Sequence, residues 1–244
     1  MVSKNQIKLI SSLQQKKYRE QHQLFVAEGI KCVNELLHAS FEPVFLLATE
    51  TVFEAKYDPL VSYISAAELQ KMSGLSSANS CLGVFKIPAS KPREDHGLIV
   101  ALDEIRDPGN LGTIIRLCDW FGVEQLFCSL ATVDIYNPKV VQATMGSLAR
   151  VAVHYVDLEK VLASTTLPVL GTFMDGDSIY QMGLPQEGII VMGNEANGIS
   201  TPITTRVTQR IAIPKFGKLQ QTESLNVATA TAIVLSECKR SSLA

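Results

Sequence analysis

After residue 97, apolar residues form short continuous runs, separated by segments with helical periodicity. The runs cover residues 98–103, 124–130, 151–156, 168–174, 188–193 and 210–214. Helical patterns lie between them at Leu111–Phe121, around Val140 and from about Ser224 to Glu237. Continuous apolar strands that alternate with helices are typical of a parallel α/β sheet covered on both faces.

The first ninety residues show a weaker alternation of the same kind. Apolar strands are predicted at 24–27, 43–48 and 61–65, with an apolar helix over 29–39 and a polar helix before the last strand. The segment from Ala89 to Gly97, ASKPREDHG, is polar and is typical of a linker. The sequence therefore predicts a small α/β domain over residues 1–90 and a larger α/β domain over residues 91–244.

The turn that follows the strand at 98–103 is the first of three unusual strand ends. It reads Asp107-Pro108-Gly109-Asn110, and we expect Asn110 to cap the following helix. Arg116 projects nearly opposite the apolar face of that helix. The segment alone favours an ordinary solvent-exposed arginine, paired with Asp119, over a functional one.

The other two strand ends lie later in the chain. Residues 193–198 read GNEANG, which suits positive φ angles and close approach of the backbone to a ligand. Thr201 should then cap a helix whose first residue is Pro202. The third strand ends at Ile213-Pro214, and Ser224-Leu225-Asn226 should begin the final helix. Because ligands of α/β sheets bind beyond the carboxyl ends of strands, the three turns predict one binding site.

Charge and cysteine content restrict the possible partners. The net charge of −2 does not indicate a nucleic-acid binder, but the first fifth of the chain is locally basic, with Lys16, Lys17 and Arg19 beside Tyr18. This cluster predicts RNA phosphate binding, and a solvated helical face is the alternative. Five scattered cysteines indicate reduced thiols in a cytoplasmic protein. We expect no metal site, signal peptide or transmembrane helix.

Together the three turns resemble the signature motifs of the SpoU/TrmH family of SPOUT RNA 2′-O-ribose methyltransferases. The resemblance covers about Leu98 to Glu237, and the N-terminal segment resembles a ribosomal-protein-like substrate-binding domain. The loop Phe216–Thr222 is longer than the family's usual loop. The matching positions are Asp107, Pro108, Asn110, Gly112 and Arg116, then Gly193, Glu195 and Gly198, then Ile213, Pro214, Ser224, Leu225, Asn226 and Val227.

The resemblance implies a C-terminal trefoil knot, a homodimer of catalytic domains and S-adenosyl-L-methionine as the methyl donor. Because chains rarely thread loops, periodicity alone would have predicted an open, unknotted sheet. Backbone groups around Gly193, Ile213 and Leu225 should hold the donor, with Gly171 and Thr172 beside them. The remaining predicted cofactor contacts are Met192, Asn194, Gly198, Pro214 and Ser224.

The family resemblance also points to Arg116 as a catalytic and RNA-binding residue. Because a guanidinium is effectively never deprotonated in proteins, we expect Arg116 to bind phosphate and stabilise the developing alkoxide. The proton would leave through Ser224, Glu195 or water, with Asn110 and Asn226 orienting these groups. The expected substrate is structured RNA, rRNA rather than tRNA. A tRNA 2′-O-methyltransferase and a catalytically silent RNA-binding protein are the alternatives.

Overall fold

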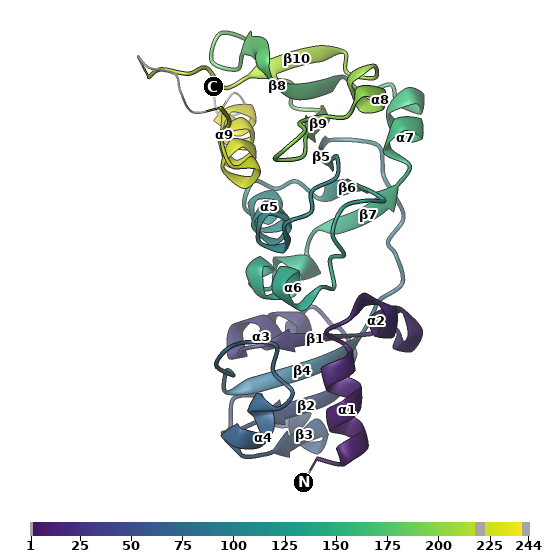
Figure 1. Cartoon of the computed structure of the whole chain (residues 1–244), viewed down its shortest axis with the longest axis vertical. Coiled ribbons are helices and arrows are strands. Elements are labelled where there is room, and N and C mark those ends of the chain that lie inside the picture. Colours follow the sequence, from purple (N-terminus) through teal and green to yellow (C-terminus); the bar gives the residue numbers. More distant parts are fainter. Residues whose placement is uncertain (1, 218–222, 241–244) are drawn as a thin grey trace. The chain divides into compact units, whose positions relative to one another are not determined.

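In the computed structural model, which describes residues 2–217 and 223–240, the chain divides into two compact units (Figure 1). The first unit contains residues up to 89 and also residues 134–150. The second unit contains residues 90–133 and the chain from 151 onward. The chain therefore leaves the second unit after residue 133 and returns to it at residue 151.

The first unit is built on a four-stranded sheet with the order β1-β4-β2-β3. The sheet is mixed, because β4 pairs antiparallel with both β1 and β2, whereas β2 and β3 are parallel. The strands are β1 (Leu24–Glu28), β2 (Pro43–Ala48), β3 (Val61–Tyr63) and β4 (Cys81–Lys86). The helices are α1 (Lys4–Ser12), α2 (Lys16–His22), α3 (Ile30–His38), the 3-10 helix η1 (Ala55–Leu60), α4 (Ala66–Gln70), α6 (Pro138–Thr144) and the 3-10 helix η2 (Ser147–Ala149).

The first unit is a small α/β domain, as predicted, and one of its four strands was not expected. The sequence pattern did not predict the strand β4, which has no helix between it and the polar linker, so the alternation of strands and helices gives no signal there. Its side chains are buried from Cys81 to Phe85, because β4 lies between β1 and β2 in the middle of the sheet. The apolar run over residues 81–85, CLGVF, is the sequence signal that could have located this strand.

Residues 134–150 pack onto the face of the first sheet that also carries α3. The Phe25 ring lies 4.7 Å from the Tyr136 ring, centroid to centroid, and 5.7 Å from that of Phe85. The Cys32 thiol lies 3.7 Å from the Val141 carbonyl oxygen. The segment from α6 to η2 therefore completes the core of a unit whose other residues lie far earlier in the sequence.

The second unit is built on a six-stranded sheet with the order β10-β8-β9-β5-β6-β7, in which every pairing is parallel. Its strands are β5 (Leu98–Leu102), β6 (Gln125–Ser129), β7 (Ala152–Val156), β8 (Val169–Ser178), β9 (Gly188–Met192) and β10 (Gln209–Ala212). Its helices are α5 (Pro108–Trp120), α7 (Leu158–Ser164), α8 (Thr201–Thr204) and α9 (Val227–Arg240). The predicted parallel sheet is confirmed for this unit.

Helices cover both faces of the second sheet, as the continuous apolar strands predicted. The helices α7 and α8 pack on one face, where Leu158, Val161 and Ile203 join Phe127 and Val191 in a buried cluster. The helices α5 and α9 lie side by side over the other face (Figure 1). Because β10 is at one edge of the sheet, the chain after β10 returns toward the sheet centre to place α9 beside α5.

Three helix starts differ from the expected ones. Asp107, not Asn110, caps α5, because its carboxylate accepts the Asn110 N–H at 2.8 Å. Ser200, not Thr201, occupies the N-cap of α8. At α9, Asn226 accepts the backbone N–H groups of Ala228 and Thr229 and so caps the helix, whereas Ser224 lies before it. These shifts change which side chains remain available for chemistry.

No helix in the described part of the chain is both long and apolar enough to span a membrane.

Candidate functional site

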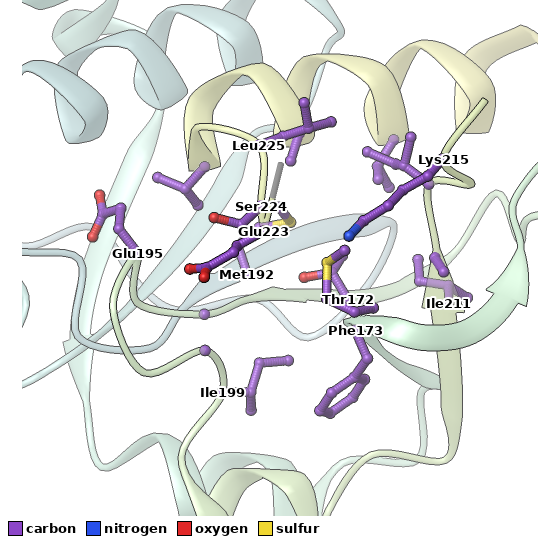
Figure 2. Close-up of a pocket in the computed structure, with 18 of the residues that line it drawn as sticks. Thr172, Phe173, Met192, Glu195, Ile199, Ile211, Lys215, Glu223, Ser224 and Leu225 are labelled. Carbon is purple, nitrogen blue, oxygen red and sulfur yellow. The ribbon is translucent and has the colours of Figure 1, made fainter. Parts of the chain in front are cut away.

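A cavity of about 1130 Å³ lies at the carboxyl ends of β8, β9 and β10 and extends to the N-terminal half of α9 (Figure 2). This is the expected place for a ligand in a parallel α/β sheet. All of the predicted cofactor-contacting residues except Gly171 line the cavity. They are Thr172, Met192, Gly193, Asn194, Gly198, Ile213, Pro214, Ser224 and Leu225.

Gly171 is buried behind the cavity wall. A Cβ atom there would lie 2.6 Å from the Phe173 ring and 2.8 Å from Val207. The absence of a side chain at residue 171 therefore permits Phe173, which does line the cavity, to pack where it does. Thr172 donates its hydroxyl hydrogen bond to the Val191 carbonyl at 3.0 Å, which ties β8 to β9 just beyond their paired residues 169–171.

The outer wall of the cavity is formed where β8 bulges away from β10. The register between the two strands shifts at Arg210/Ile211, so that residues 172–176 lie outside the ladder. The Arg210 guanidinium carbon lies 3.5 Å from the centre of the Phe173 ring, and the same guanidinium pairs with Asp175. This hydrogen bond to Arg210 lowers the pKa of the Asp175 carboxyl. The cation–π contact and the ion pair together fix the wall.

The turn over residues 193–198 folds back on itself. Asn194 and Gly198 exchange two backbone hydrogen bonds, and a Cβ atom on Gly193 would lie 2.3 Å from the carbonyl carbon of Gly198. The Asn194 amide donates to the Glu104 carbonyl, and its oxygen accepts the Ala196 N–H. Gly193 is thus required by the protein's own backbone, and the Asn194 side chain holds the turn in shape.

A chain of hydrogen bonds connects the three motifs. The Asn110 amide donates to the Glu195 carboxylate at 2.6 Å, and the Asn226 amide donates to the Asn110 oxygen at 2.9 Å. Asn226 accepts in turn from the first N–H groups of α9. The turn after β5, the turn after β9 and the start of α9 therefore meet at one point, although residues 110 and 226 are far apart in sequence.

Arg116 lies on the exposed face of α5 and does not line the cavity. Within residues 2–217 and 223–240, no hydrogen bond or ion pair involves its guanidinium, including any with Asp119. Asn110 is located six residues earlier on the same helix. Arg116 is therefore an exposed cation on the helix that carries Asn110 into the network. Of the other predicted catalytic residues, the structure brings Asn110, Glu195 and Asn226 together in one hydrogen-bonded chain. Ser224 lies in the cavity lining.

Two charged residues of the cavity were not predicted from the sequence. Lys215 follows Ile213-Pro214 directly, and Glu223 precedes Ser224. Figure 2 shows Lys215 reaching into the cavity on the side away from Glu195. Each is adjacent in sequence to a motif residue, Pro214 or Ser224, and this is the sequence signal that could have identified them.

Of the expected RNA-binding cluster in the first unit, Arg19 requires a correction. Its side chain is 3% exposed, and its guanidinium pairs with Asp134 and donates to the Leu13 carbonyl. An arginine whose donors are used inside the core does not bind phosphate. Lys16 and Lys17 are exposed on α2, and Lys16 lies 3.7 Å from the Glu20 carboxylate.

No group of three or more metal-ligating side chains gathers anywhere in the described ranges.

Comparison with known proteins identifies the family of both units. The model of the SpoU rRNA Methylase family matches residues 97–236, and the model of the MRM3-like substrate binding domain matches residues 4–83. The 23S rRNA (guanosine(2553)-2'-O)-methyltransferase RlmP of Bacillus subtilis is 27% identical over 245 residues, which cover 96% of each chain.

Two solved structures extend the likeness to the whole fold. A protein from Porphyromonas gingivalis described as an RNA methyltransferase of the TrmH family has a TM-score of 0.89 at 37% identity, and the match covers 98% of this chain and 99% of that one. An rRNA methyltransferase from Sinorhizobium meliloti with AdoMet bound has a TM-score of 0.85 at 28% identity, covering 98% and 97%.

These matches confirm the expected fold class, an α/β SpoU-type domain with a parallel sheet preceded by a small domain. They also confirm the enzyme class, an RNA 2′-O-methyltransferase, and its cofactor, S-adenosylmethionine. The family model covers more than half of the sequence and includes all three strand-end motifs. The chain belongs to the SpoU rRNA Methylase family.

Proposed function

We propose that this protein methylates a ribose 2′-OH of ribosomal RNA rather than of tRNA. The geometry that carries the proposal is the hydrogen-bonded chain from Glu195 through Asn110 to Asn226 at the edge of the donor cavity. The preference for rRNA is supported by RlmP, which acts on 23S rRNA and aligns along 96% of both chains, including the small N-terminal unit.

The cavity fits the methyl donor. Its lining is largely apolar around Ile179, Ile211 and Val234, which suits a purine, and backbone groups of the turns at 193–198 and 211–214 can bind polar atoms of the ribose and base. When bound, S-adenosylmethionine supplies a methyl group on a sulfonium centre, which is already a strong electrophile. The protein must therefore mainly align the hydroxyl group and accept its proton.

Arg116 is proposed to bind the RNA phosphate beside the target ribose and to stabilise negative charge on the 2′-oxygen. Its guanidinium is exposed and unengaged among the described residues, so it is available to an incoming phosphate. A planar guanidinium can form two parallel hydrogen bonds to a phosphate, which fixes orientation as well as position. It is not proposed as the base, because a guanidinium is effectively never deprotonated in proteins.

The proton is proposed to leave through Glu195, Ser224 or a water molecule between them. Glu195 and Ser224 both line the cavity, and Glu195 is held by the Asn110 amide. Asn226 fixes Asn110 and is itself fixed by the start of α9. The two asparagines therefore act as positioning residues, which keep the carboxylate at the cavity edge.

The first unit is proposed to bind the RNA substrate through α2. Lys16 and Lys17 are exposed there, and the Lys17 ammonium lies 5.8 Å from the centre of the Tyr18 ring. The rings of Tyr18 and His22 are stacked, with their centres 6.5 Å apart. Cations next to aromatic rings that are at least partly exposed suit phosphates and unpaired bases.

The protein is further proposed to act as a homodimer in the cytoplasm. The dimer proposal comes from the family resemblance, and sedimentation that finds a stable, active monomer would contradict it. The compartment is inferred from the cysteines, all five of which are buried and outside any disulfide. Burial raises the pKa of Cys32, Cys81 and Cys118 to about 12, so these thiols stay protonated and unreactive.

The test is transfer of a labelled methyl group, under single-turnover conditions, to rRNA and to tRNA purified separately from cells that lack the protein. We expect labelling of rRNA only, at one position that is unmethylated in those cells and methylated in cells that contain the protein. Labelling of tRNA alone would contradict the substrate proposal. An RNA with 2′-deoxyribose at the mapped position is the control, and methylation that survives there would contradict 2′-O transfer.

A further inference from the structure

Only three charged side chains line the described part of the cavity: Glu195, Lys215 and Glu223. Glu195 accepts the Asn110 hydrogen bond and belongs to the network at the cavity edge. Within the described ranges, neither Lys215 nor Glu223 has a hydrogen-bond or ion-pair partner. One cation and one anion therefore line a largely apolar cavity without an assigned function.

Lys215 and Glu223 enter the lining from different segments of the chain. Lys215 follows β10 and the Ile213-Pro214 pair, whereas Glu223 comes just before Ser224 and α9. Figure 2 shows the Lys215 side chain extended with its ammonium inside the cavity, above Thr172. Around it, the lining offers Phe173, Ile211 and other apolar groups.

The methyl donor carries a charge pattern that matches these two residues. Its adenosine part is uncharged, but its amino-acid end has one carboxylate and one ammonium group. Taking either charge out of water without a partner is costly. We propose that Lys215 binds the carboxylate and Glu223 the ammonium, so that together they form the subsite for the amino-acid end. This inference rests on the proposed methyl-transfer function, because it assumes the same cavity and donor.

A contact between Lys215 and RNA phosphate is the competing explanation. It is less favoured, because the Lys215 ammonium points into the donor cavity and not along the outer surface of α5, where Arg116 lies. It also leaves Glu223 unexplained, since a carboxylate beside that phosphate would repel it. One cation and one anion in the lining of the same cavity suit a zwitterion better than a polyanion.

The experiment is a binding cycle measured by calorimetry on the full chain. The three ligands are S-adenosylmethionine and S-adenosylhomocysteine, which have the amino-acid end, and 5′-methylthioadenosine, which lacks it. Lys215→Met, which keeps the length of the side chain, should weaken S-adenosylhomocysteine by about tenfold and leave methylthioadenosine unchanged. Lys91→Ala, in the exposed linker, is the matched control and should change neither affinity.

Glu223→Gln should weaken both S-adenosylmethionine and S-adenosylhomocysteine by a similar factor, again without effect on methylthioadenosine. A loss confined to S-adenosylmethionine would place Glu223 at the sulfonium and contradict its assignment to the ammonium. Because the two groups are exposed in the free protein, we expect both losses to diminish as the salt concentration rises.

Equal weakening of S-adenosylhomocysteine and methylthioadenosine by Lys215→Met would overturn the inference, since the lysine would then support the cavity as a whole. Unchanged affinity for both, with weaker RNA binding, would overturn it in favour of the phosphate contact. If the unmodified chain binds none of the three ligands, the proposed function itself fails. The two failures are therefore distinguishable.

Discussion

At the scale of single residues, side chains with the same chemistry have different roles because their surroundings differ. Arg19 is buried with its donors satisfied by Asp134 and backbone carbonyls, whereas Arg116 is exposed on α5. Arg210 packs on the Phe173 ring and pairs with Asp175. Only an arginine whose hydrogen-bond donors are free can receive an incoming phosphate, and this distinguishes Arg116 from the other two.

Arg116→Ala should leave folding and donor affinity nearly unchanged, because the side chain is exposed and does not line the cavity. Methyl transfer should fall by about 10²–10⁴, the usual scale for a group that assists proton transfer. Arg116→Lys should recover only part of the rate if planar positioning matters. The measurement is single-turnover transfer to rRNA. The control is Arg206→Ala, another exposed arginine of the same unit, and near-normal transfer in Arg116→Ala would exclude a catalytic role.

Gly193→Ala should destabilise the protein, because the new Cβ would lie 2.3 Å from the Gly198 carbonyl carbon and 2.4 Å from the Ile199 nitrogen. Backbone atoms cannot move aside as a flexible side chain can, so we expect a loss of about 1–3 kcal/mol in the free energy of unfolding. Gly183→Ala, which meets nothing within 4 Å, should stay within about 0.5 kcal/mol of the original. Denaturant unfolding of both variants measures this. Equal stabilities would show that the 193–198 turn can relax.

At the scale of elements, the helices place the polar and charged side chains that the proposed function uses. The helix α5 carries Asn110 to Glu195, and the start of α9 holds Asn226 against Asn110. The helix α2 presents Lys16 and Lys17 to solvent, although the neighbouring Arg19 points inward. Because residues one or two positions apart on a helix do not face each other, Lys17 can be exposed while Arg19 is buried.

Reversing Lys16 and Lys17 to glutamate should weaken RNA binding and reduce the salt dependence of the affinity. Each phosphate contact contributes a slope of about 0.9 in a plot of log affinity against log salt for a duplex, so two lost contacts should lower the slope by about 2. The control is Lys4→Glu with Lys8→Glu on α1, which changes the net charge equally. If both double variants lower the slope alike, the effect comes from overall charge and not from α2.

The sequence was most informative where a motif and an apolar run coincide. The strand ends at Asp103, Gly193 and Pro214 could be located in advance, because each buried strand stops at a polar or glycine-containing turn. Hydrogen-bond partners were less predictable. The capping function moved from Asn110 to Asp107, since two polar residues at the same turn compete for the same N–H groups. The strand β4 and the charges of Lys215 and Glu223 had no periodic signal.

At the scale of the whole molecule, the chain contributes to the first unit twice. Residues up to 89 form its sheet, and residues 134–150 return to cover one face of it. Arg19 with Asp134 and Phe25 with Tyr136 join the two segments inside that unit. A division of the chain at residue 90 follows the polar linker, yet it leaves part of the first unit's core on the other side.

A fragment of residues 1–89 should therefore be much less stable than the same fragment joined through a short glycine–serine linker to residues 134–150. Without that segment, Arg19 loses its carboxylate partner and Phe25 loses the Tyr136 ring. An uncompensated buried charge alone costs about 3–5 kcal/mol, which is a large share of the stability of so small a domain. Urea unfolding followed by circular dichroism should show a cooperative transition only for the joined fragment.

Asp134→Ala in the joined fragment should remove most of the gain in stability, because it leaves Arg19 buried and unpaired. Equal urea midpoints for the two fragments would mean that residues 134–150 merely rest on a unit that is already complete.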